Sequence, residues 1–415
     1  MKGKFLLGLL FALLALFTGA ASAASSQPVV SHTFVCNGNA IQRTGPCPNG
    51  NGINSLIQGS DGNFYGTAEF SASGETSGSA GTIFSVTPAG QFTPLHTFVA
   101  NAKGAFANGA NPLSLTEGPD GKLYGLTNGG VGVVFRMDKT GSSFKVIHHF
   151  CSVGTSCSSQ GTIGVGVLRV GKDGNIYGAT NEGGTGCSGV GCGTIFRVTP
   201  SSGAYAVVAL FTSDVTGFPY GLTAASDGTF YGLTANGSSL FHFDPATEAL
   251  QLMALSFPFP AGCGGVACFA TGTLAFGPSG NLYGLYTEYD TGGSGLFEVE
   301  TDGSHLQLSP LYNATLLGGG PMELLLGGDG NFWIPESVGG TGSGDLIALS
   351  PSNGKVLQTL APFGTAAPAG AFPSSLMQAK DGTLWGTASE YGVVPKAHFG
   401  GGTVYSVNLG LPPAQ

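Results

Sequence analysis

The sequence is poor in charge, because Asp, Glu, Lys and Arg together make up 9% of its 415 residues. Charged residues form about a quarter of an ordinary globular chain. The scarcity excludes a coiled coil or a helical bundle, both of which need many Glu and Lys side chains. The few cations are scattered singly and the formal net charge is −9. We therefore predict that the protein binds neither nucleic acid nor an anionic membrane surface.

Long hydrophobic runs are also scarce. Residues 5–17 form an apolar run of 13 residues, whereas a membrane-spanning helix needs about 20. The run follows Lys2 and Lys4 and precedes the small residues 21–23, which is the pattern of a secretory signal peptide. We predict a signal peptide at residues 1–23, no membrane span, and an exported protein located in the periplasm or outside the cell.

The eight cysteines show no C-x2-C spacing and no neighbouring histidine, so we expect no metal or other cofactor. An even number of cysteines in an exported chain favours disulfides. Each cysteine has a partner nearby in the sequence, and we predict four local bridges: Cys36–Cys47, Cys151–Cys157, Cys187–Cys192 and Cys263–Cys268.

Glycine is in excess, with 73 residues, and many glycines belong to one repeat, Asp-Gly-x-apolar-aromatic-Gly. Its seven copies are DGNFYG (61–66), DGKLYG (120–125), DGNIYG (173–178), DGTFYG (227–232), SGNLYG (279–284), DGNFWI (329–334) and DGTLWG (381–386). An apolar run precedes each copy, and a run such as GTIFSVTP (81–88) follows it, in most copies with a fourth run after a short turn. Each repeat therefore predicts four β-strands.

The local signals agree with short antiparallel strands. Asp-Gly between two such runs indicates a hairpin with a type I′ turn, in which both central residues have positive φ. In NFYGT both Phe64 and Tyr65 are large and apolar, which is typical of a sheet that is buried on both faces. The repeated Asp residues are interpreted as turn residues rather than calcium ligands. The repeated Tyr and Trp residues, with His32, His96 and His148, are interpreted as packing groups.

The two ends of the chain complement each other. The seventh copy lacks its fourth run, and VVSHTF (29–34) copies LHTF (95–98). We predict an all-β fold, a seven-bladed β-propeller of four-stranded antiparallel blades, whose ring is closed by the N-terminal strand completing the last blade. The domain, expected to be a monomer, spans 24–415, with blade repeats at about 54–98, 113–150, 166–211, 220–257, 272–312, 322–363, and 374–408 plus 29–35.

The candidate site lies on one face of this disc. The Asp-Gly turns are short, whereas the connections on the opposite face are long and contain all four cysteine pairs. Function concentrates on such loops. Alternatively, these loops could be insertions that the fold tolerates and that the disulfides hold in place. In the loop 389–401, His398 and Glu390 are candidate acid–base groups. Candidate binding residues on the same face are Tyr391, Lys396, Glu182, Glu288 and Glu336.

The pair DGNFYGT and GTIFSVTPAGQFTPLHTF resembles the GloVer tandem repeat of "choice-of-anchor" exported bacterial proteins. The resemblance implies an exported repeat protein of uncharacterised activity, often anchored at its C-terminus, whereas no hydrophobic tail follows residue 409 here. DGNFWIPE (329–336) resembles a blade of the streptogramin lyases, which are seven-bladed propellers that use His and Glu with a divalent metal. Only His398 occupies a loop suited to that role.

Two functional hypotheses follow. The first is an interaction scaffold that binds a protein or a glycan through the loop-rich face. The alternative is a lyase or hydrolase similar to the streptogramin lyases, with a site at the central opening.

Overall fold

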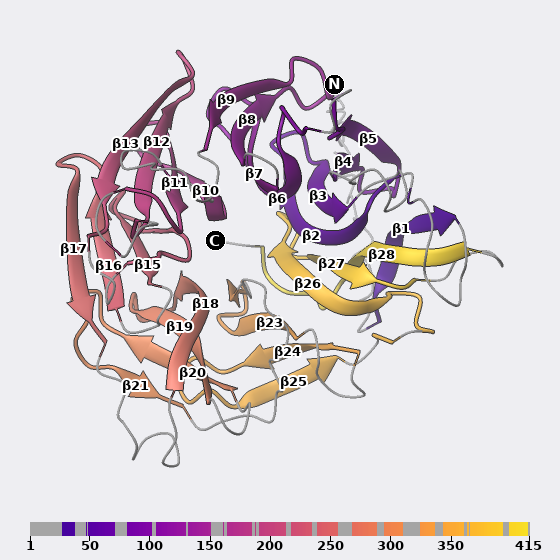
Figure 1. Cartoon of the computed structure of the whole chain (residues 1–415). Coiled ribbons are helices and arrows are strands. Elements are labelled where there is room, and N and C mark those ends of the chain that lie inside the picture. The colour runs from indigo at the N-terminus through magenta and orange to yellow at the C-terminus, as the bar shows by residue number, and fades with distance from the viewer. Residues whose placement is uncertain are drawn as a thin grey trace, which may run out of the picture.

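The computed structural model describes residues 27–37, 47, 49–70, 81–101, 105–129, 132–150, 161, 164–184, 187, 191–212, 217–234, 239–255, 268–288, 294–309, 324–336, 343–360, 363–364, 366–392 and 398–413. The described chain contains only β-strands and their connections, in seven four-stranded antiparallel sheets. The sheets stand around a central opening as a seven-bladed β-propeller (Figure 1). None of the described residues belongs to a helix that could cross a membrane. The predicted signal peptide lies outside the described residues.

The strands follow the chain from sheet to sheet. The first three sheets contain β2 (Asn51–Gln58), β3 (Phe64–Phe70), β4 (Thr82–Val86) and β5 (Phe92–Thr97); β6 (Ala110–Glu117), β7 (Leu123–Gly129), β8 (Val133–Met137) and β9 (Lys145–His149); and β10 (Gly164–Val170), β11 (Ile176–Thr180), β12 (Thr194–Thr199) and β13 (Ala204–Leu210). In each sheet the first strand lies next to the central opening and the fourth strand lies at the periphery (Figure 1).

The remaining sheets repeat this order. They contain β14 (Thr223–Ala224), β15 (Phe230–Leu233), β16 (Ser239–Asp244) and β17 (Ala249–Ala254); β18 (Cys268–Phe276), β19 (Leu282–Glu288), β20 (Ser294–Val299) and β21 (Gln307–Leu308); β22 (Leu325–Leu326), β23 (Phe332–Glu336), β24 (Asp345–Leu349) and β25 (Val356–Leu360); and β26 (Ala371–Gln378), β27 (Leu384–Glu390), β28 (His398–Val407) and β1 (Val29–Asn37).

The Asp-Gly hairpins form as predicted, but the predicted turn type is wrong. In the first sheet the amide of Gly62 donates to the carbonyl of Gly59, and the amide of Gly59 donates to the carbonyl of Asn63. Gly62 has φ +85°, whereas Asp61 is not among the residues with positive φ. A type I′ turn needs positive φ at both central residues, so the loop is instead a three-residue connection whose glycine takes the left-handed position.

The repeated Asp does more than shape its turn. Asp61 accepts a hydrogen bond from the amide of Asn63 (3.2 Å) and another from the hydroxyl of Tyr65 (2.7 Å). The hydroxyls of Tyr124 and Tyr177 donate in the same way to Asp120 (3.0 Å) and Asp173 (2.8 Å). The Asp and the aromatic residue four positions later therefore act as a pair, a link that sequence analysis missed.

The second Gly of the motif is required by an aromatic ring on the neighbouring strand. Gly125 is directly opposite Phe135, and a Cβ at Gly125 would overlap Cζ of that ring. A Gly–Phe or Gly–Tyr pair recurs at this register in six sheets. In the sixth sheet Ile334 replaces the glycine and faces Ile347. The ring fits because its partner has no side chain.

The repeated Tyr and Trp residues pack against the next sheet around the axis, as predicted. Tyr65 lies in one buried cluster with Leu115 and Phe135 of the second sheet. Trp333 packs with Leu384 and Tyr405 of the seventh sheet. Most residues of the third strand are buried in the first six sheets. Sheet-to-sheet burial of large aromatic side chains therefore contributes to the stability of the ring.

The chain ends lie side by side in the seventh sheet. β1 pairs with β28 in antiparallel register from Val29 opposite Ser406 to Asn37 opposite His398. Contacts between the seventh and first sheets repeat those found elsewhere in the ring. The Ser374 hydroxyl donates to the carbonyl of Ile53 at 2.6 Å, and Trp385 stacks on Phe64 with 3.9 Å between ring centroids. The N-terminal strand thus supplies the fourth strand that the seventh repeat lacks.

Candidate functional site

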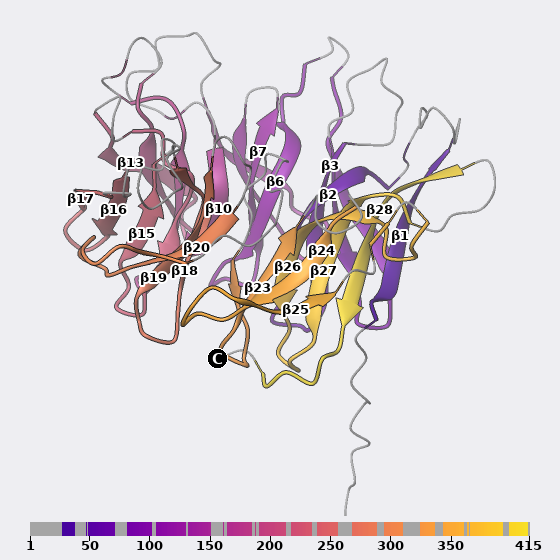
Figure 2. The same cartoon turned by 90° about the horizontal axis from the view of Figure 1, so that it is seen from below.

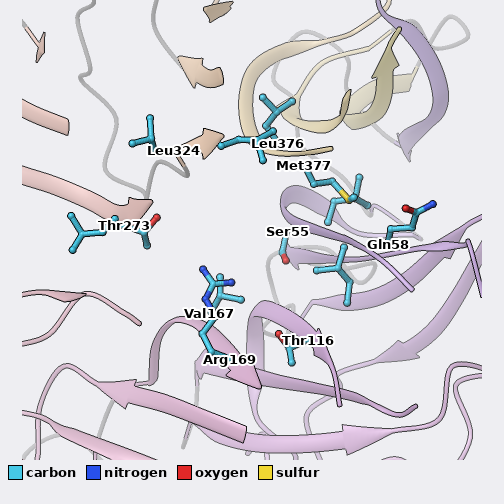
Figure 3. Close-up of a pocket in the computed structure, with 13 residues that line it drawn as sticks. Ser55, Gln58, Thr116, Val167, Arg169, Thr273, Leu324, Leu376 and Met377 are labelled. Carbon is cyan, nitrogen blue, oxygen red and sulfur yellow. The ribbon is translucent and has the colours of Figure 1, made fainter. Parts of the chain in front are cut away.

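A cavity of about 310 Å³ lies at the centre of the ring. Side chains from six of the seven inner strands line it, and Figure 3 shows them pointing from separate strands into a common space. The lining residues are Ser55, Leu56, Ile57 and Gln58 of β2; Thr116 of β6; Val167 and Arg169 of β10; Thr273 and Leu274 of β18; Leu324 and Leu325 at β22; and Leu376 and Met377 of β26. The size falls within the range of small-ligand sites, roughly 300–1,000 Å³.

The cavity lies toward the face that carries the Asp-Gly turns. Gln58 is the last residue of β2 and Arg169 the penultimate residue of β10, so both directly precede such turns. The end of the described chain reaches the same face (Figure 2), where the carbonyl of Pro412 accepts a hydrogen bond from Nε2 of Gln378 (2.8 Å). The cavity is therefore not on the loop-rich face to which the sequence analysis assigned the binding surface.

The cavity walls are held by hydrogen bonds between neighbouring inner strands. The hydroxyl of Thr116 donates to the carbonyl of Leu168 (2.6 Å), and Nε of Arg169 donates to the carbonyl of Leu222 (2.9 Å). Further round the ring, the Thr223 hydroxyl donates to the Leu274 carbonyl at 2.7 Å. Such contacts between sheets fix the lining in place before any ligand arrives, which lowers the entropic cost of binding.

Among the described residues of the lining, Arg169 is the charged one. It lies four positions before the Asp of its repeat, where the other sheets place Ile57, Thr116, Thr223, Ala275, Leu325 and Met377. Figure 3 shows its guanidinium pointing from β10 toward the middle of the cavity. The lining residues that the structure describes include no carboxyl or imidazole group. Comparing the repeats position by position would have singled out this arginine, which the sequence analysis did not do.

A second feature lies at the loop-rich end of the sixth sheet, where Glu336 and Asp345 are direct cross-strand partners. Both are buried, with 4% and 5% of their surfaces exposed, and Oε1 of Glu336 has no hydrogen-bond partner. Burial, together with the nearby Asp345, raises the pKa of Glu336 to about 7, and burial also raises the pKa of Asp345. Sequence analysis named Glu336 but missed Asp345.

The signal for this pair was present in the repeats. Where the sixth sheet has Glu336 opposite Asp345, the first has Ala68 opposite Thr82 and the seventh has Ala388 opposite Thr403. Both partners depart from the repeat in the same sheet, and both become acidic. A substitution shared by two facing positions indicates a local change of environment rather than drift at one position.

The other sequence-predicted residues that the structure describes belong to the third, fifth and seventh sheets. Glu390 ends β27, Tyr391 follows it and contacts Phe372 (6.3 Å between ring centroids), and Glu182 follows β11. Glu288 ends β19 and His398 begins β28, with the structure describing only their backbones. Lys396 lies outside the described residues. Within the described part of the chain no three His, Cys, Asp or Glu side chains are placed to hold a metal ion, so this part does not fit the metal site that a streptogramin-lyase resemblance implies.

Three histidines have the same structural position in successive sheets. The rings of His32, His96 and His148 stack on an aromatic ring of the next sheet, with centroids 4.0, 3.8 and 3.6 Å apart. Burial lowers the pKa of each to about 4. These neutral rings are packing groups, as predicted.

Two of the four predicted disulfides form in the described residues. Cys36 is bonded to Cys47 and Cys187 to Cys192. The predicted bridges Cys151–Cys157 and Cys263–Cys268 lie outside the residues whose side chains the structure describes.

The sheets and the axial cavity together define a seven-bladed β-propeller with a central pocket. Residues 51–262, about half of the chain, match the model of the Gloeobacter/Verrucomicrobia repeat. The chain belongs to this repeat family. No curated protein is similar enough to the chain to count as a match.

Solved structures with the same fold are distant in sequence. Virginiamycin B lyase from Staphylococcus aureus, solved with quinupristin, has a TM-score of 0.56 at 15% identity, covering 87% of this chain and 96% of that one. The periplasmic gluconolactonase of Pseudomonas aeruginosa has a TM-score of 0.51 at 17% identity, covering 74% and 84%. The extracellular domain of a putative one-component system from B. thetaiotaomicron has a TM-score of 0.55 at 14% identity, covering 94% and 44%. At these identities the likeness concerns the fold alone.

Proposed function

We propose that this chain is an exported binding protein, without catalytic activity of its own, that takes part of a protein or glycan ligand into the axial cavity. The observation that carries the proposal is the composition of that cavity. Hydroxyl, amide, guanidinium and apolar groups line it, and among the described residues of the lining none is an acid or a histidine. Such groups can fix and orient a ligand, but they lack the carboxyl or imidazole that general acid–base chemistry commonly uses.

Two further observations support an exported scaffold. The disulfides Cys36–Cys47 and Cys187–Cys192 suit an oxidising compartment. The hydrogen bonds between the inner strands hold the walls rigidly, as a preformed site requires. Ligand binding at the centre of a rigid ring needs no movement of the sheets.

The test is a cavity-filling substitution. Val167→Trp places a large ring among the lining side chains, whereas Leu252→Trp places the same ring at an exposed position of the peripheral strand β17. The purified protein and both variants are applied to a glycan array and to a library of immobilised peptides. We expect some ligands to be retained by the unmodified protein and by Leu252→Trp, but not by Val167→Trp.

A variant that replaces the loop 389–401 by Gly and Ser separates the two faces. If the loop variant loses the ligands while Val167→Trp retains all of them, the binding site lies on the loop-rich face. That result would refute the cavity as the binding site. Failure of all four proteins to retain any glycan or peptide would refute the binding function itself.

A lyase or hydrolase activity remains the second candidate, and the Glu336–Asp345 pair favours it. A buried carboxyl with a pKa of about 7 can both donate and accept a proton near neutral pH. The test is hydrolysis or elimination measured on a panel of lactone and ester substrates, with Glu336→Gln as the diagnostic variant. Turnover that falls at least about 100-fold in this variant would establish the catalytic alternative. Absence of turnover would remove it.

A further inference from the structure

We propose that the loop-rich end of the seventh sheet holds a second binding site, at which the rings of Phe372 and Tyr391 together bind one sugar residue of a neutral glycan. The site goes beyond the proposed function, because Phe372 lies at the opposite end of β26 from the cavity-lining residues Leu376 and Met377. The inference rests on the backbone conformation of the two aromatic residues and on the contact between their rings.

Phe372 has a left-handed backbone, with φ +58°. At the same position, nine residues before the turn Asp, the first sheet has Gly52 (φ +64°) and the second has Asn111 (φ +54°). Gly and Asn enter the left-handed region at low cost, whereas a bulky side chain is strained there. The fourth sheet repeats the strained arrangement with Phe218 (φ +62°). The fold therefore requires a left-handed residue at this position, but not an aromatic one.

Tyr391 is a second bulky residue in the left-handed region, with φ +63°. It lies ten residues after the turn Asp, where the third sheet has Gly183 (φ +89°). The two positions are equivalent, because the carbonyl of each accepts a hydrogen bond from a glycine further along the chain. Gly193 donates to Gly183 (2.9 Å) and Gly402 donates to Tyr391 (3.1 Å). The seventh sheet thus has aromatic residues at two positions where a glycine suffices in other sheets.

Hydrogen bonds hold both residues in this conformation. The amide of Phe372 donates to the carbonyl of Ser343, which precedes β24 (2.8 Å), and the hydroxyl of Ser389 donates to the carbonyl of Phe372 (3.2 Å). The amide of Tyr391 donates to the carbonyl of Gly400 (3.1 Å). Strained residues persist only where the surrounding structure fixes them, and they gather at ligand-binding sites. Both rings are therefore positioned before a ligand arrives.

The two rings meet although they come from separate strands. Their centroids are 6.3 Å apart, their planes are inclined by 44°, and both side chains are partly exposed. The face of a sugar ring carries C–H groups that interact with aromatic π systems, and its hydroxyls lie around the edge. Glu390, which directly precedes Tyr391, brings a carboxylate that can accept hydrogen bonds from hydroxyls. A purely apolar side chain would use the rings and not the carboxylate.

The charge of the protein favours a neutral glycan. The formal net charge is −9, and the carboxylate of Glu390 lies beside the two aromatic residues in the sequence. An anionic sugar would approach against this charge, whereas an uncharged one would not.

The experiment measures binding to the purified protein by isothermal titration calorimetry. The probes are the neutral oligosaccharides cellohexaose, xylohexaose, maltohexaose and chitohexaose, together with an acetylated and amidated peptide of alternating proline and leucine. We expect at least one oligosaccharide to bind at least about ten-fold more tightly than the peptide.

Two variants introduce the residues that other sheets have at these positions. Phe372→Asn and Tyr391→Gly should each weaken oligosaccharide binding roughly ten-fold, the loss typical of an aromatic contact. Neither should lower the melting temperature, because the relief of backbone strain offsets the lost ring contact. Tyr391→Phe keeps the ring and should keep most of the affinity. Phe218→Asn is the matched control, because it removes the same side chain from the same backbone conformation in the fourth sheet, and it should bind as the parent protein does.

Several results would overturn the inference. Failure of every oligosaccharide to bind, or tighter binding of the peptide, would refute the glycan assignment. Equal weakening in Phe372→Asn and Phe218→Asn would refute the assignment to the ring pair. A fall in melting temperature of more than about 3 °C in Phe372→Asn or Tyr391→Gly would show that the rings are packing groups.

One further variant separates this site from the axial cavity. Val167→Trp fills the cavity and should bind the oligosaccharides as the parent protein does. Loss of binding in Val167→Trp, with retention in Phe372→Asn, would place the sugar in the cavity. In that case this inference fails and the proposed function stands.

Discussion

Acidification should destabilise the propeller through its stacked histidines, and His96 isolates the effect. Its ring stacks on Phe144 with 3.8 Å between centroids, and its Nε2 is buried without a hydrogen-bond partner. Burial lowers the pKa of His96 from 6.5 to about 4. The unfolded chain therefore binds a proton at a higher pH than the folded chain does, and stability is lost as the pH falls from 6.5 toward 4.

The magnitude follows from the two pKa values. At pH 4.5 the linkage relation gives an upper limit of about 2.6 kcal/mol for this histidine at 1.36 kcal/mol per pH unit. The ring is only partly buried, so solvent screening reduces the expected effect to about 1–1.5 kcal/mol. At pH 7.5 the histidine is neutral in both states and the contribution vanishes.

His96→Phe is the informative variant, because phenylalanine keeps the stack on Phe144 and cannot be protonated. The free energy of unfolding in urea is measured for the parent and the variant at pH 7.5 and pH 4.5. We expect the variant to gain about 1–1.5 kcal/mol relative to the parent between these two pH values. His149→Phe, at the exposed neighbour of His148 on β9, serves as the control. A difference between His96→Phe and the parent that is the same at both pH values would refute the reasoning.

Three more outcomes follow from the packing and the buried charges. Gly125→Ala should lower the free energy of unfolding by about 1–3 kcal/mol, because the new methyl group overlaps the Phe135 ring. Adding Phe135→Ile should restore part of that loss, which a double-mutant cycle measures. Glu336→Gln should stabilise the protein above pH 7 on the order of 1–3 kcal/mol and have little effect near pH 5. The reason is that the raised pKa of Glu336 makes the parent protein lose stability as the pH rises through about 7. A difference in urea unfolding that does not depend on pH would contradict this. Tyr124→Phe should cost about 0.5–1.5 kcal/mol in thermal unfolding by removing the hydrogen bond to Asp120, and no loss would show that the bond adds nothing net.

Much of the fold could be predicted because the information is local and repeated seven times. An apolar run, an Asp-Gly turn and a second run specify a hairpin without reference to the rest of the chain. The turn type was wrong, because Asp61 and Gly62 were assumed to occupy both central positions of a two-residue loop. The structure places Gly62 alone at positive φ. Local sequence identified the turn but not which residue takes the left-handed conformation.

The site was less predictable, because it depends on which repeats face one another. In the sequence, Arg169 is recognisable only as a residue of a β-strand. The closed ring places it beside lining residues from β2, β6, β18, β22 and β26. The buried Glu336 was identifiable, but its partner Asp345 is defined by register across β23 and β24. The binding surface was predicted on the loop-rich face because the connections there are long and contain cysteines. The cavity instead follows from the spacing of the inner strands.

By itself, the sequence determined the β-strands, their order within each repeat and the burial of the repeated aromatic residues, since these depend on neighbours a few positions away. Only the tertiary structure decided that Arg169 faces an aliphatic wall and that Glu336 lies opposite Asp345. The physical reason is that a repeat fixes what each sheet looks like, while the environment of a side chain at the axis is set by six other sheets, far away along the chain.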